Sequence, residues 1–101
     1  MSVYTKTMFK QNLNSRFWLQ EEDGARATLE LFALNDGRST ARQEQFSLLF
    51  RGDPQKIYGQ RLYAMGHEAI GELELFLVPV GHDESGTVYE AVFNRLLKRA
   101  S

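Results

Sequence analysis

Two histidine-containing turns are the places where side chains of this sequence could do chemistry. The first is His82-Asp83-Glu84-Ser85, four polar residues in a row. A serine triad needs partners that converge in space, whereas neighbours in a turn generally point apart. The run could offer oxygens to a hard cation, but it lacks the spaced acidic ligands and the length of a calcium loop. We interpret it as a solvated turn, because these residue types are common turn formers.

The second turn contains His67-Glu68, with Glu72 nearby. Zinc requires three or four converging ligands, and this chain has two histidines and no cysteine. If residues 61–65 and 72–80 pair as strands, His67 lies at a hairpin tip rather than in a cleft. We interpret it as a structural or interface histidine, and we expect no catalytic residue, no cofactor and no metal. Neither phosphate-cradling glycine pattern, GxGxxG or GxxxxGK[ST], occurs.

The balanced charge makes nucleic acid an unlikely partner. Twelve basic residues face 13 acidic ones, and the formal net charge is -1. Nucleic-acid binding by counterion release normally concentrates positive charge. Aromatic residues reach 12% and are interpreted mainly as core. Trp18 and Phe32 are the exceptions, because each lies on the strand face opposite the clearest core residues and is expected to be exposed and adhesive.

The elements that must position these residues are mostly strands within a single domain, residues 1–101. Residues alternate between two faces in several segments, as half-buried strands require. The predicted core rows are Leu29, Leu31 and Ala33; Phe46, Leu48 and Phe50; and Tyr89, Ala91 and Phe93. The predicted strands are residues 17–20, 27–34, 43–50, 61–65, 72–80 and 87–95, separated by glycine-containing turns. Asp23-Gly24 indicates a type I′ hairpin turn.

Three features qualify this pattern. The run from residue 75 to 80 is apolar on both faces, which indicates a strand covered on both sides, and Pro79 is expected where that strand leaves the sheet. Thr7 is expected to cap a short helix that Asn14 closes. Asp53-Pro54 and residues 96–99 could each begin a further helical turn. The predicted fold is all-β, a small antiparallel barrel or sandwich of about six strands with one or two short helices.

The longest apolar run, LFLVPV, is far below the ~20 residues that a membrane span needs. The first 14 residues have no apolar run of the kind found in signal peptides. From these two observations we expect a cytoplasmic protein.

Several motifs resemble a known family. FSLLFRGDP is followed by Tyr63, His67 and Ile70-Gly71, and then by GELELFLVPVGHD and VYEAVFNRL. This order is similar to a family of small bacterial domains without known function. It spans about half the chain, most specifically at LFLVPVG and YEAVFN, and the N-terminal third is looser. The resemblance implies a subunit of an assembled particle, of the phage-tail-like kind, and brings no catalytic residue with it.

Three functions remain open from the sequence. The favoured one is a non-enzymatic structural or interaction domain that pairs with itself or with an assembly partner through sheet edges and exposed aromatics. Its candidate interaction residues are Trp18, Phe32, His67 and His82. The alternative is a small-ligand or nucleic-acid binding module at a barrel mouth. An enzyme would have to use His67 or His82 as its acid–base group.

Overall fold

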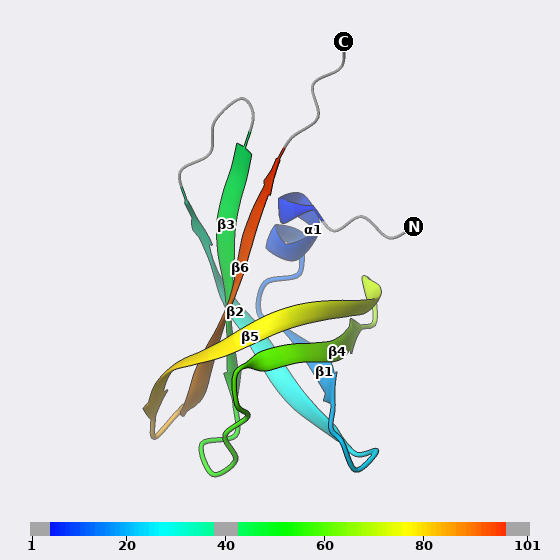
Figure 1. Cartoon of the computed structure of the whole chain (residues 1–101), viewed down its shortest axis with the longest axis vertical. Helices are drawn as coiled ribbons and strands as arrows, with labels where there is room; N and C mark the ends of the chain where they lie inside the picture. The colour runs from blue at the N-terminus through cyan, green and yellow to red at the C-terminus, as the bar shows by residue number, and fades with distance from the viewer. Residues whose placement is uncertain (1–4, 38–42, 97–101) are drawn as a thin grey trace.

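Six antiparallel strands close into a barrel in the order β1-β2-β3-β6-β5-β4 (Figure 1). The computed structural model describes residues 5–37 and 43–96. The strands are β1 (Ser15–Gln20), β2 (Arg26–Asp36), β3 (Gln43–Gly52), β4 (Arg61–His67), β5 (Gly71–Asp83) and β6 (Gly86–Leu96), and the helix α1 (Lys6–Gln11) precedes them. The all-β prediction is confirmed, and of the two architectures left open the chain forms the barrel. Each predicted strand is present and is longer than predicted.

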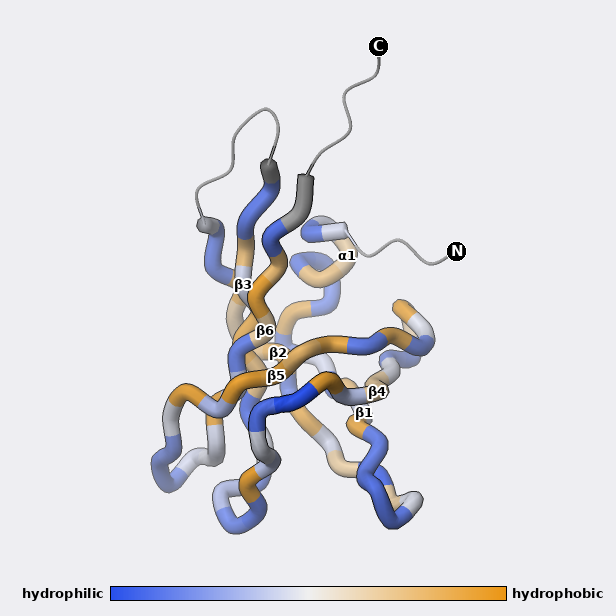
Figure 2. The backbone as a smooth tube through the Cα atoms, viewed as in Figure 1, coloured by the Kyte–Doolittle hydropathy of each residue, from blue (hydrophilic) through white to orange (hydrophobic). Residues whose placement is uncertain are grey.

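The core lies inside the barrel, where the apolar side chains of each strand alternate inward. The predicted rows on β3 and β6 are buried from Phe46 to Phe50 and at Tyr89 and Ala91. On β2 the row is interrupted, because a register shift lies between Leu31 and Ala33. Beyond this bulge Leu34 packs against the core in the place predicted for Ala33. Figure 2 shows hydrophobic segments gathering where the strands cross and polar segments in the turns.

The strand β5 differs from its prediction in two ways. Leu73, Leu75 and Leu77 are buried, but Phe76 is 49% exposed and Val80 is 52% exposed, so only one face is covered. The strand also continues through Pro79 to Asp83. A register shift between Pro79 and Gly81 accommodates the proline, since a bulge leaves one residue outside the hydrogen-bonded ladder.

The helix α1 begins two residues earlier than predicted. Its N-cap is Thr5, not Thr7, and the Oγ1 of Thr5 accepts a hydrogen bond from the backbone N–H of Met8 at 3.1 Å. The helix ends at Gln11, so the expected extension to Asn14 is wrong. Residues 53–60 form a turn rather than a helix. The tail from 97 to 99 lies outside the described residues, and Leu96 ends β6.

Two hairpin turns place the segments around the candidate site. The β1–β2 turn has a left-handed Gly24 (φ 90°), but Asp23 does not share that conformation. A type I′ turn requires positive φ at both central residues, so that prediction is wrong although the hairpin forms. The Gly24 N–H donates to the Glu21 carbonyl oxygen instead, at 3.2 Å. The β5–β6 hairpin closes at the Asp83–Gly86 pair, as the turn interpretation of residues 82–85 predicts.

The barrel has two openings where neighbouring strands diverge. β5 and β6 pair only as far as Val78 and Glu90, and α1 fills the space above them by packing Phe9 against Phe46 and Phe93. β1 and β4 pair at two positions only, Trp18 with Gly66 and Leu19 with Met65. Beyond these pairs the two strands separate (Figure 1). We call this second opening the seam.

Candidate functional site

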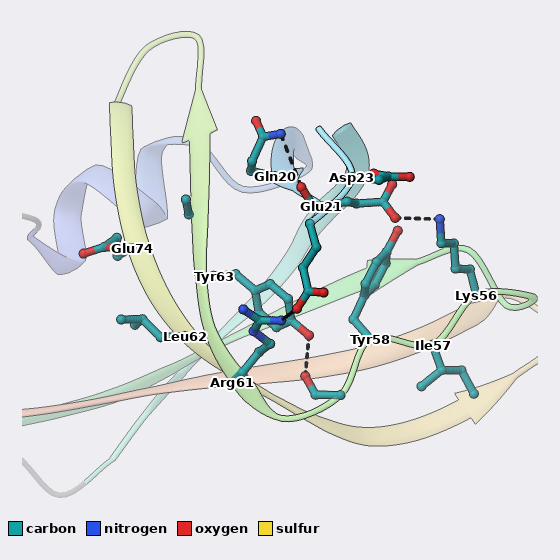
Figure 3. Close-up of a pocket in the computed structure, with 13 residues that line it drawn as sticks. Gln20, Glu21, Asp23, Lys56, Ile57, Tyr58, Arg61, Leu62, Tyr63 and Glu74 are labelled. Carbon is teal, nitrogen blue, oxygen red and sulfur yellow. Dashed lines mark hydrogen bonds and ion pairs between the residues drawn. The ribbon is translucent and has the colours of Figure 1, made fainter. Parts of the chain in front are cut away.

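A groove of about 620 Å³ occupies the seam. It is lined by residues 20–23 of the β1–β2 turn, 56–59 of the segment before β4, 61–64 of β4, and Glu74 of β5. Figure 3 shows how these side chains surround it: Tyr58 and Lys56 come from the loop, and Leu62 and Glu74 come from the sheet. We call this groove the seam groove.

The charges around the seam groove are unbalanced toward acid. Four carboxylates, Glu21, Glu22, Asp23 and Glu74, face two cations, Lys56 and Arg61. Lys56 Nζ lies 2.5 Å from Glu21 Oε1, and Arg61 pairs with Glu22, so both cations bridge the gap between the strands. Hydrogen bonding to these carboxylates raises the pKa of both cations. Within the described part of the chain, neither Asp23 nor Glu74 forms an ion pair.

Two tyrosine hydroxyls hold in place the loop segment that lines the seam groove. The backbone N–H of Tyr58 donates to the Tyr89 hydroxyl at 2.9 Å, and the Tyr63 hydroxyl donates to the Gly59 carbonyl oxygen at 2.6 Å. Desolvation by burial raises the pKa of Tyr58, Tyr63 and Tyr89. These hydroxyls therefore stay protonated at neutral pH. Tyr63 and Tyr89 use theirs to anchor residues 58 and 59, which suits a rigid binding surface better than acid–base chemistry.

His67 is a buried structural group rather than an exposed hairpin tip. It is the last residue of β4 and is 8% exposed. Its Nδ1 accepts hydrogen bonds from the backbone N–H of Ala69 at 2.9 Å and of Ile70 at 3.3 Å. An Nδ1 that accepts cannot carry a proton, so the ring is the Nε2–H tautomer and donates to Ser15 Oγ at 2.8 Å. The Ser15 hydroxyl in turn donates a hydrogen bond to the Asn12 carbonyl oxygen.

The domain should lose stability below neutral pH because of His67. Desolvation lowers the pKa of His67 from 6.5, partly opposed by Glu68. Below about pH 6.5, His67 therefore binds a proton more readily in the unfolded chain than in the folded chain. The free energy of unfolding is therefore unaffected by protonation of His67 above pH 6.5. It decreases as pH falls from 6.5 toward the pKa of His67 in the folded chain, by up to about 1.4 kcal/mol per pH unit.

Urea unfolding between about pH 5 and 8 measures this effect. A His67→Asn variant keeps an acceptor near the Ala69 N–H and removes the titrating ring, so its stability should vary less with pH. A His82→Gln variant is the control for losing the other histidine and should keep the wild-type slope. An unchanged slope in His67→Asn would contradict the assignment.

His82 lies on a different hairpin from His67 and is exposed. Its Nε2 is 2.7 Å from the Pro54 carbonyl oxygen, so it links the β5–β6 hairpin to residues 53–60. The neighbouring Asp83 accepts hydrogen bonds from the backbone N–H groups of Ser85 and Gly86. The two histidines are therefore not brought together. Among the described residues no group of three or more histidines and acidic residues could hold a metal ion.

Trp18 and Phe32 lie on the outer face, but they are half-buried rather than exposed. The Arg26 guanidinium lies 4.2 Å from the Trp18 ring centroid, and the Arg51 guanidinium lies 4.1 Å from that of Phe32. The Trp18 indole also lies against the backbone of β4, where a Cβ on Gly66 would stand 1.9 Å from the ring. Cations of the same chain thus cover part of both rings, so the expectation that the rings are exposed is wrong, and their role as interaction residues stays a prediction.

Other side chains form the exposed apolar surface. The large hydrophobic residues exposed in the described ranges are Ile57, Leu62, Phe76, Val80 and Val92, of which Val92 is 66% exposed. Sequence reasoning missed Phe76 because it lies within an apolar run. Its alternation with Glu72 and Glu74 was the available signal, since residues that share their parity on a strand share a face. Leu62 opposes Phe76 in the β4–β5 register.

Comparison with known proteins identifies the family and adds no function. None of the helices described is long and apolar enough to cross a membrane. No curated protein and no solved structure matches the chain. The model of a protein family matches residues 4–93, which confirms the resemblance to a functionally uncharacterised domain family. The chain therefore belongs to the family described as Domain of unknown function (DUF6916).

Proposed function

We propose that this domain is a non-enzymatic interaction subunit that associates with a second copy of itself through the outer face of β4, β5 and β6. The observation that carries the proposal is a set of exposed apolar side chains on that face. Leu62 and Phe76 are opposite in register. Phe76 and Val92 each lie two residues beyond the paired Val78 and Glu90, on the outer face of their strands, where β5 and β6 begin to diverge. We call Leu62, Phe76 and Val92 the apolar stripe.

The energetics of the apolar stripe support association. Burying a side chain of this kind stabilises a complex by about 1.5–3 kcal/mol, whereas leaving it in water contributes nothing. Arg61 and Glu74 flank Leu62 and Phe76 along β4 and β5. A two-fold interface brings the same patch of both copies together, so charges of both signs at its edge favour self-association.

The barrel interior gives less support to a ligand-binding module. Its volume is filled by buried side chains from all six strands and α1, including the large residues Phe17, Phe50 and Tyr89. A ligand in the barrel mouth would have to displace this core, and rebuilding a packed core costs several kcal/mol.

Solution mass tests the proposal. Light scattering over about a hundredfold range of protein concentration should show an oligomer, and Val92→Lys should raise its dissociation constant by about tenfold or more, because a charge replaces an apolar contact. Glu84→Lys, on the exposed β5–β6 turn, is the control and should leave the mass unchanged. A monomer at every concentration would refute association through the apolar stripe.

The assembly we propose for this subunit is a bacterial particle of the phage-tail-like kind, in which it is a structural component or adaptor. Its support is the resemblance at LFLVPVG and YEAVFN, together with the apolar stripe. Exposed apolar sheet faces and free strand edges are surfaces through which β domains associate, and this domain has both.

A further inference from the structure

We propose that the seam is a strand-addition site, which binds an extended segment of a partner protein in which apolar and basic side chains lie two positions apart. The inference rests on the proposed function as an interaction domain. The seam adjoins the apolar stripe at Leu62 and does not include Val92. It follows from the free edge of β4, from the shape of the seam groove and from the charge around it.

The free edge of β4 is the first observation. Residues Arg61–Ala64 pair with β5, from Leu77 to Glu74. On the other side the β1 register reaches only Met65 and Gly66, so these four residues have no strand beside them among those described. Backbone groups on such an edge are the template that an added strand requires. The opposite opening of the barrel has no such vacancy, because α1 fills it with Phe9.

The dimensions of the seam groove suit an extended peptide. Four residues of strand are about 13 Å long, and a neighbouring strand lies about 4.8 Å away. The seam groove lines this edge with about 620 Å³ of space. The Tyr63 and Tyr89 hydroxyls hold in place the loop segment that lines it, so the site is already formed and a peptide would bear most of the ordering cost.

The register of β4 and β5 specifies what the peptide must carry. Leu62 is opposite Phe76, and Ala64 is opposite Glu74. A peptide residue beside Leu62 would extend this apolar row, so an aliphatic side chain fits there. Two positions along, a residue lies beside Ala64, whose methyl group is small enough for lysine or arginine to reach across to Glu74.

The charge of the seam groove selects the same peptide. Four carboxylates face two cations, and Lys56 and Arg61 are already bridged to Glu21 and Glu22. An incoming basic side chain meets the excess acid at Glu74 and Asp23, which form no ion pair among the described residues. An acidic peptide would be repelled, and complementarity of this kind separates right partners from wrong ones.

Fluorescence anisotropy with short labelled peptides tests the proposal. A peptide in which valine and lysine lie two positions apart with serine between them (Val-Ser-Lys-Ser repeats) should bind the full domain, and the same peptide with glutamate in place of lysine should not. Glu74→Lys should weaken the lysine peptide by about tenfold and allow the glutamate peptide to bind. Glu84→Lys removes an exposed carboxylate of the β5–β6 turn that does not line the seam groove, and it should leave both affinities unchanged.

A second peptide separates strand addition from simple charge attraction. Two methylated forms of the valine–lysine peptide are compared, one methylated at its odd-numbered and one at its even-numbered backbone nitrogens. Each form lacks the hydrogen-bond donors of one strand edge and keeps all side chains. If β4 binds through its backbone, one of the two methylated peptides should lose binding and the other should keep it. The backbone amide signals of the β4 residues should shift in NMR spectra of the domain when the unmethylated peptide is added. Equal binding of both methylated peptides, or equal binding to Glu74→Lys, would overturn the proposal.

The proposal and the proposed function fail separately. A wild-type oligomer that binds none of these peptides would refute the seam and leave the apolar stripe standing. A Val92→Lys protein that is monomeric and still binds the valine–lysine peptide would show that the two surfaces are independent, and it would support the seam.

Discussion

Gly86→Ala should destabilise the domain by about 2–6 kcal/mol, the sum of backbone strain and a steric clash. Gly86 has φ 146°, a conformation that side chains with a Cβ rarely adopt. A Cβ at this position would also stand 2.2 Å from the Gly52 carbonyl oxygen and 2.8 Å from Arg51 Cγ. The backbone contact cannot be relieved by a rotamer change, because Gly52 is paired to β6 at Thr87. Thermal unfolding should show a melting temperature lower by roughly 10 °C or more.

Gly71→Ala is the matched control for this substitution. Gly71 also has a positive φ, 88°, but a Cβ there would meet nothing within 4 Å. It should therefore cost only the left-handed strain, about 1–2 kcal/mol. The difference between the two variants measures the close approach of the β5–β6 hairpin to β3. Equal losses of stability would mean that the Gly52 contact relaxes without cost.

Phe9→Ala should lower the free energy of unfolding by about 3–5 kcal/mol, because it removes the side chain with which α1 fills the opening between β5 and β6. Phe9 is 0% exposed, and its ring centroid lies 5.4 Å from that of Phe93 and 6.3 Å from that of Phe46. It is the buried residue of α1. A helix of six residues does not form without tertiary packing, so α1 should detach when this contact is lost.

Urea unfolding and limited proteolysis measure the two parts of this effect. The free energy of unfolding should fall in Phe9→Ala, and α1 should become cleavable before the barrel does. Lys10→Ala, on the exposed side of the same helix, should change stability by less than about 0.5 kcal/mol. A Phe9→Ala protein as stable and as resistant as Lys10→Ala would show that α1 does not close the barrel.

The sequence by itself determined the strands, because their signal is local. Alternation at Phe46, Leu48 and Phe50 defines both the strand and its buried face, and the glycine turns mark its ends. The same reasoning correctly predicted an all-β fold from the amino-acid sequence alone. It failed at β5, where a run of apolar residues hid an alternation that leaves Phe76 and Val80 in water.

The tertiary structure alone decided which strands meet and where they separate. Three features depend on partners in other strands: the position of Pro79 at a bulge, the burial of the His67 ring beside Ser15, and the coverage of Trp18 by Arg26. The seam also depends on how strands from different parts of the chain meet, since β1 and β4 share two paired positions and then diverge. Periodicity reports which face of a strand is apolar, but the identity of the neighbouring strand is set by packing across the whole barrel.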